Sequence, residues 1–60
     1  MTITNGLGQT YNTNEMTGWE VKRLAAELRA EFAIARSVSK MDFLRDQISE
    51  VDSEIRNKMY

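Results

Sequence analysis

The chain has 60 residues, with eight Lys or Arg against nine Asp or Glu, and it contains neither cysteine nor histidine. A domain of this size buries only about 60% of the surface that its unfolded chain exposes, so it needs an added source of stability. The composition excludes disulfides and sites with thiolate or imidazole metal ligands, so we expect no metal and no cofactor. The near-neutral charge argues against a polybasic nucleic-acid or membrane-surface protein. The remaining source of added stability is association with a second copy or with a partner.

The sequence also lacks the features of a membrane or secreted protein. It contains no run of about eighteen apolar residues, and residues 1–10 have neither the basic nor the apolar region of a signal peptide. We therefore expect a cytoplasmic protein, and a viral protein located in the host cytoplasm or in the virion would look the same.

Residues 1–16 are rich in Thr, Asn and Gly and show no helical period. Asn and Gly favour turns, and Thr disfavours helix interiors. We predict an irregular arm that is flexible alone and becomes ordered when it lies on a partner. Its expected anchors are the apolar side chains Ile3, Leu7 and Tyr11.

An alternative for this arm is a small β-hairpin. The pair Asn5-Gly6 has the composition of a tight turn, which would place Thr2 to Thr4 opposite Leu7 to Tyr11. A lone two-stranded ribbon is barely stable in water, so such a hairpin needs a surface to lie on.

Two helices are predicted in residues 17–60. Thr17 and Glu20 have the spacing of a capping box, which starts a helix over about residues 18–36. Ser39 with Asp42 repeats the signal and starts a second helix over about residues 40–58. The short connection favours an all-α, antiparallel helical hairpin, although one continuous bent helix is the alternative because the connection holds no strong helix breaker.

Each helix carries an apolar stripe. The second helix has a heptad-like run between Met41 and Met59, and the first has a face wide enough to meet it. The predicted seam consists of Val21, Leu24, Leu28, Phe32, Met41, Leu44, Ile48, Val51 and Ile55. We expect this seam to close the hairpin and two hairpins to dimerise into a four-helix bundle.

Apolar residues also lie outside the seam. Trp19, Ala26 and Ala33 recur every seven residues on the other side of the first helix, with Ile34 nearby, and Phe43 points away from the seam of the second. Two apolar faces imply two neighbours. Trp19, Ile34 and Phe43 are therefore predicted to bind a partner protein. For Trp19 the equally weighted alternative is packing back on Met16 or the arm.

The charges of the first helix are segregated. Lys22, Arg29 and Arg36 lie on one flank of the stripe, and Glu20, Glu27 and Glu31 lie on the other. We expect these charges to border the seam and to select partner orientation, with Asp52 and Glu54 as mates in the second helix. The alternative is a basic strip of Lys22, Arg29 and Arg36 that binds nucleic acid, for which three cations are a modest supply.

The sequence holds no catalytic signature. It has no phosphate-binding glycine loop and no histidine base, and its carboxylates are expected on helix surfaces. We predict a non-enzymatic protein that self-associates and binds another protein, as an adaptor, an assembly factor or an inhibitor of the kind phages encode. A nucleic-acid-binding regulator is the alternative, and a structural virion or scaffold component is a further one.

Overall fold

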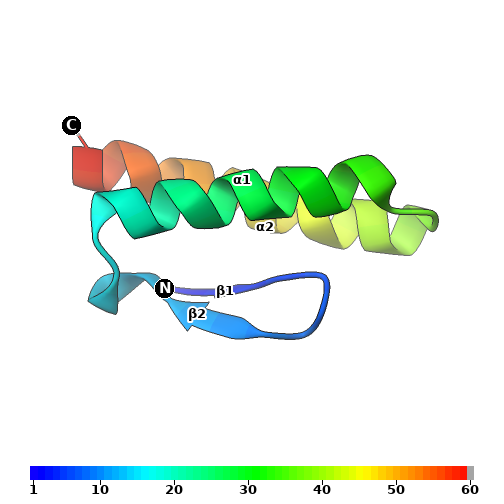
Figure 1. Ribbon diagram of the computed structural model, residues 1–60, viewed down its shortest axis with the longest axis horizontal. Coiled ribbons are helices and arrows are strands. Elements are labelled where there is room, and N and C mark those ends of the chain that lie inside the picture. The colour runs from blue at the N-terminus through cyan, green and yellow to red at the C-terminus, as the bar shows by residue number, and fades with distance from the viewer. Residues whose placement is uncertain (60) are drawn as a thin grey trace.

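The structure is a computed structural model that describes residues 1–59 and contains a β-hairpin followed by two α-helices (Figure 1). The elements are β1 (Thr2–Thr4), β2 (Thr10–Asn12), the short 3₁₀ helix η1 (Thr13–Glu15), α1 (Gly18–Ile34) and α2 (Val38–Met59). The two helices lie side by side and run antiparallel, and the β-hairpin covers one side of the pair (Figure 1). The side chain of Met59 and all of Tyr60 lie outside the described part of the chain. The predicted helical hairpin is confirmed, but the arm is a small sheet instead of an irregular segment.

The start of α1 is fixed by the predicted capping box. The hydroxyl of Thr17 accepts the Glu20 amide at 3.3 Å, and the Glu20 carboxylate accepts the Thr17 amide at 3.1 Å. These two bonds satisfy amides that have no partner inside the helix. The helix therefore begins at Gly18, as the sequence predicts.

The connection between the helices lies two residues earlier than predicted, at residues 35–37 instead of 37–39. Helix α1 ends at Ile34, and Ala35 turns out of the helix with extended backbone angles. The hydroxyl of Ser37 accepts the Lys40 amide at 3.1 Å, so Ser37 caps α2 and the helix begins at Val38. The prediction that Ser39 caps α2 is wrong because the earlier serine takes that role, which places Ser39 inside the first turn. Residues 35–37 are not helical, which also excludes the continuous bent helix.

The β-hairpin has a different register from the one that an Asn5-Gly6 turn would give. Ile3 is paired with Tyr11, and the loop between the strands covers residues 5–9. Asn5 organises this loop, because its side-chain oxygen accepts the amides of Leu7 and Gln9 at 3.0 and 2.9 Å. Gly8 adopts a φ of 84°, a conformation that favours glycine. The turn thus forms around the Asn5 side chain.

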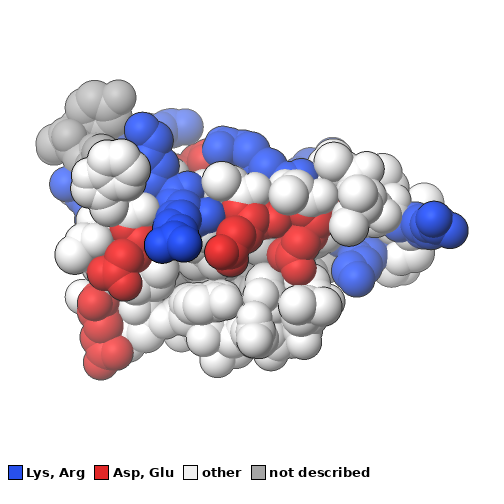
Figure 2. All heavy atoms as spheres, viewed as in Figure 1, with Lys and Arg blue, Asp and Glu red and all other residues white. Residues whose placement is uncertain are grey.

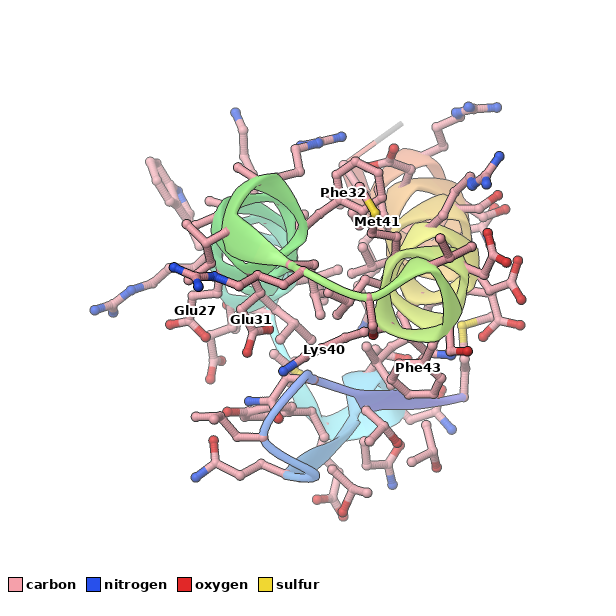
Figure 3. All side chains as sticks on the ribbon, turned by 90° about the vertical axis from the view of Figure 1, so that its right-hand side faces the viewer. Glu27, Glu31, Phe32, Lys40, Met41 and Phe43 are labelled. Atoms are coloured by element: carbon pink, nitrogen blue, oxygen red, sulfur yellow. The ribbon has the colours of Figure 1, made fainter. Side chains whose placement is uncertain are left out.

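The core lies where the two helices and the β-hairpin meet. Seven apolar side chains are buried there: Ile3, Val21, Leu24, Ala25, Leu28, Leu44 and Val51. Phe32, Ile48 and Ile55 are half-buried against them, and Met41 is also half-buried. Figure 3 shows Phe32 and Met41 over the junction of the helices, on the side away from the β-hairpin. The predicted seam therefore closes within one chain.

Three polar contacts hold the β-hairpin and its exit on the helix pair. The Thr4 amide donates to the Gln47 side chain at 2.9 Å, and the Gly6 amide donates to Glu31 at 3.2 Å. At the other end, the Lys58 ammonium donates to the Met16 carbonyl at 2.7 Å. Within residues 1–59, neither helix combines the length and hydrophobicity that a bilayer crossing requires.

Candidate functional site

The side of α1 that faces away from the core presents a continuous row of exposed residues. This row, the outer face of α1, consists of Trp19, Arg23, Ala26, Ala30 and Ala33. Trp19 is 76% exposed, although tryptophan is among the side chains that gain most from burial. The opposite side of the same helix supplies Val21, Leu24 and Leu28 to the core. The expectation that α1 has two apolar faces agrees with this exposure pattern.

The Trp19 side chain is largely exposed to solvent. Met16, which was one expected neighbour, packs instead against the core. The ammonium of Lys22 lies 5.9 Å from the centre of the indole ring, within the range of a cation–π contact. The indole therefore keeps its large apolar surface available on the outer face of α1.

Charges border this face with opposite signs. Figure 2, in which α1 is at the front, shows basic side chains along the upper edge of the helix and acidic ones along the edge that faces the β-hairpin. The acidic flank is Glu20 and Glu27, continued by Glu31. The predicted basic flank is Lys22, Arg29 and Arg36, but Arg36 lies beyond the end of α1, in the connection to α2. The segregation predicted from the sequence therefore has two distinct edges in three dimensions.

One of the three cations of the basic flank is already engaged. A guanidinium nitrogen of Arg29 lies 2.7 and 2.9 Å from the two carboxylate oxygens of Asp52, which joins α1 to α2. The prediction of Asp52 as a mate for this flank is confirmed. Glu54, the other expected mate, takes no part in the two ion pairs found within residues 1–59. The basic strip suggested for nucleic acid is thus partly neutralised by the chain itself.

A shallow groove of about 460 Å³ runs between α1 and the strand β2. Its lining includes Tyr11 and Leu24 together with the charged residues Glu20, Arg23 and Glu27. Arg23 therefore lies on the acidic side of the outer face of α1. Arg23 thus shares the lining of this groove with two carboxylates.

A second hollow of about 460 Å³ lies at the end of the molecule where α1 turns into α2. We call it the tip hollow, and its lining is Leu7, Glu31, Ile34, Ala35, Arg36, Ser37 and Lys40. Leu7 and Ile34 are each 78% exposed, and Val38, at the start of α2, is 74% exposed. The loop of the β-hairpin and the end of α1 thus bring together two residues that the sequence assigned to partner binding.

The remaining predicted anchors are placed differently. Ile3 is fully buried in the core, so it offers no surface to a partner, and Tyr11 is half-buried against the same core. Phe43 is 41% exposed, and Figure 3 shows it on the side of α2 that faces the β-hairpin. These three side chains hold the β-hairpin side of the molecule together, and only part of Phe43 remains free.

Sequence reasoning missed two residues of the outer face, Arg23 and Ala30. The sequence contains the signal, because residues 19, 23, 26, 30 and 33 are separated alternately by four and three positions. That alternation is typical of a helix–helix seam. This spacing was not recognised at Arg23 and Ala30 because arginine and alanine are weak markers of an apolar stripe.

Among residues 1–59, no cluster of three or more His, Cys, Asp or Glu is arranged to hold a metal ion. Comparison of the chain with protein-family models, with curated proteins and with solved structures gave no match. The function is therefore inferred from the exposed surfaces of the molecule.

Proposed function

We propose that this chain is a non-enzymatic protein-binding module that self-associates and holds a partner protein as an adaptor, an assembly factor or an inhibitor. The observation that carries the proposal is the outer face of α1, a helix face with an exposed tryptophan and three exposed alanines. Contiguous apolar surface of this kind on a small protein marks an interaction site, whereas single exposed apolar residues do not.

The energetic weight of this face comes mainly from Trp19. Full burial removes about 150–250 Å² of a tryptophan from water, which at about 25 cal/mol per Å² is worth roughly 4–6 kcal/mol. Because Trp19 is 76% exposed in the single chain, most of that gain is still available. It is comparable to the total stability of a small domain, about 5 kcal/mol at the low end.

The alanines determine what kind of partner fits. Short side chains at Ala26, Ala30 and Ala33 let a second helix approach α1 closely, so the face suits a helix better than a sheet or an extended peptide. Two helix pairs joined through this face make a dimer of four helices. The tip hollow, with Leu7 and Ile34 exposed beside Arg36 and Lys40, is then left free for a different protein.

Sedimentation of the purified chain across a micromolar concentration series tests self-association. We expect a reversible dimer whose tryptophan emission shifts to shorter wavelength as it forms. Trp19→Ala should weaken the dimer by at least tenfold and leave the helix content unchanged. A strictly monomeric chain with unchanging emission contradicts self-association, and a large loss of helicity in Trp19→Ala would identify the indole as core.

Val38→Ala is the matched control for this measurement. Val38 is 74% exposed but lies at the start of α2, away from the outer face of α1. Its removal should leave dimerisation unchanged. If both variants weaken the dimer equally, the association uses exposed apolar area without preference for α1.

The partner half of the proposal is tested by affinity capture from the native host. The wild-type chain is compared with Leu7→Ser/Ile34→Ser, which alters the tip hollow. A protein retained by the wild type and lost with the double variant is a candidate partner. Equal recovery of every captured protein would remove the tip hollow from the proposal.

A further inference from the structure

The outer face of α1 has the geometry of a coiled-coil seam. Trp19, Ala26 and Ala33 form one set of positions spaced by seven, and Arg23 and Ala30 fall between them. All five are exposed, and they lie opposite the residues that α1 buries. The face is therefore complete as one half of a helix–helix interface, with no second half in the single chain.

The charges beside this seam decide which partner matches it. In heptad terms, Lys22 and Arg29 occupy the position on one side of the seam, and Glu20 and Glu27 occupy the position on the other. Figure 2 shows basic side chains along the upper edge of α1 and acidic ones along the edge that faces the β-hairpin, with one basic side chain among the acidic ones. A matching helix needs carboxylates facing the first edge and cations facing the second, and α1 itself carries both.

Only one orientation of a second α1 satisfies this requirement. When two identical helices pack antiparallel, each flank meets the same flank of its partner, which here sets cations against cations and carboxylates against carboxylates. When they pack parallel, each flank meets the opposite one. Lys22 of one copy then faces Glu27 of the other, and the pair occurs twice by symmetry.

We propose that the occupant of the outer face of α1 is a second copy of this chain, with the two α1 helices parallel and in register. This inference rests on the self-association proposed above and adds its partner surface and its orientation. The resulting dimer has its four helices in a row instead of around a shared core. The seam residues of each helix pair already pack against each other within their own chain.

The rest of the fold leaves room for this arrangement. Figure 3, viewed along the helices, shows the β-hairpin below the helix pair. A two-fold axis parallel to α1 places the β-hairpin of the second copy above its own helix pair, so the two β-hairpins lie on opposite sides. Arg23, the charged member of the seam, lines the groove with Glu20 and Glu27, on the acidic side of the alanine row.

Single cysteines test the orientation, since the chain has no native cysteine. Under mild oxidation, a parallel dimer in register links through both Ala26→Cys and Ala33→Cys. In an antiparallel pair centred on Ala26, the two thiols at position 33 are separated by about 21 Å along the axis, because a helix rises about 1.5 Å per residue. A disulfide needs Cα atoms within about 7 Å, so that pair links only through Ala26→Cys.

Ser53→Cys, on the exposed side of α2, is the background control. Rapid crosslinking of Ala26→Cys and Ala33→Cys above this background supports the proposal. Crosslinking of Ala26→Cys alone overturns it in favour of the antiparallel pair. If the wild-type chain dimerises by sedimentation but neither alanine variant crosslinks, the dimer uses another surface or an antiparallel pair centred elsewhere on α1, and self-association survives without this inference. A monomer in both measurements removes both proposals.

Charge reversal at Lys22 provides an independent measurement. In the parallel dimer, Lys22→Glu sets a carboxylate against Glu27 of the other copy, twice by symmetry, and should weaken association roughly tenfold. In the antiparallel dimer, the same change relieves repulsion with Arg29 and strengthens association. The double variant Lys22→Glu/Glu27→Lys should restore the parallel dimer to within a few-fold, with helix content monitored by circular dichroism.

Discussion

The conformation of single residues in the loop of the β-hairpin determines its shape. The Asn5 side chain is buried to 5% exposure and accepts two amides of the loop, and its own amide group donates to the Gln9 side chain at 2.9 Å. Gly8 completes the loop in the left-handed region, with φ at 84°. The identity of the residue, and not its hydrophobicity, therefore matters at these two positions. Neither Asn5 nor Gly8 can be recognised from the spacing of apolar residues in the sequence.

Gly8→Ala should destabilise the fold by about 1–2 kcal/mol, the penalty for a side chain in the left-handed region. A Cβ atom at Gly8 meets no atom within 4 Å, so the effect isolates the backbone conformation. Gly8→Asn is the control and should lose less, because asparagine adopts this region more readily. Urea unfolding followed by circular dichroism measures both. Equal losses for the two variants would show that the conformation of Gly8 is not the cause.

At the scale of elements, the helices were predictable because their signals are local. The capping box of Thr17 and Glu20 gave the start of α1, and the apolar spacing gave the face that each helix buries. The start of α2 was misplaced because Ser37 and Ser39 are both acceptable caps. The choice between them depends on where α1 stops, and the extended backbone of Ala35 leaves Ser37 as the first residue able to accept the amide of Lys40.

Ser37→Ala should destabilise the chain by about 1 kcal/mol, since the Lys40 amide loses its acceptor. Ser39→Ala is the matched control, and we expect it to be neutral or slightly stabilising because alanine is the better helix former inside a first turn. Thermal or urea unfolding of the two variants gives the comparison. A larger loss of stability for Ser39→Ala would show that Ser39, and not Ser37, caps α2.

At the scale of the whole molecule, the β-hairpin is a third wall of the core. Ile3 contributes a fully buried side chain to the cluster formed by Leu28, Leu44 and Val51. The sequence did not reveal this role, because residues 1–16 carry few apolar side chains and a short β-hairpin is stable only on a surface provided by distant residues. The sheet was therefore available only as an alternative, with the wrong turn.

Ile3→Ala should destabilise the chain by about 2–5 kcal/mol, the usual range for a buried isoleucine. Ile34→Ala is the control, because Ile34 is 78% exposed and its loss should change stability by less than about 0.5 kcal/mol. Both variants remove the same atoms, and equilibrium unfolding in urea compares them directly. A small effect at Ile3 would mean that the helix pair is stable without the β-hairpin.

The candidate surfaces were predicted in part. Trp19 and Ile34 are exposed, because a large apolar residue of α1 that is out of phase with the seam has no place in the core, and Leu7 is exposed in the loop of the β-hairpin. The tip hollow was not predictable, since it depends on the loop of the β-hairpin reaching the end of α1, where Glu31 accepts the Gly6 amide. Local pattern identifies the face of a helix but not the distant segment that lies beside it.

The bond from the Thr4 amide to the Gln47 side chain joins residues 43 positions apart. The β-hairpin leaves the ribosome before the helices on which Ile3 is buried, because they follow it in the chain. Closing so long a loop is slow compared with forming a helical turn, so we expect the helix pair to form first and the β-hairpin to dock on it. The β-hairpin, which is synthesised before the helices, is then the last of these elements to reach its place.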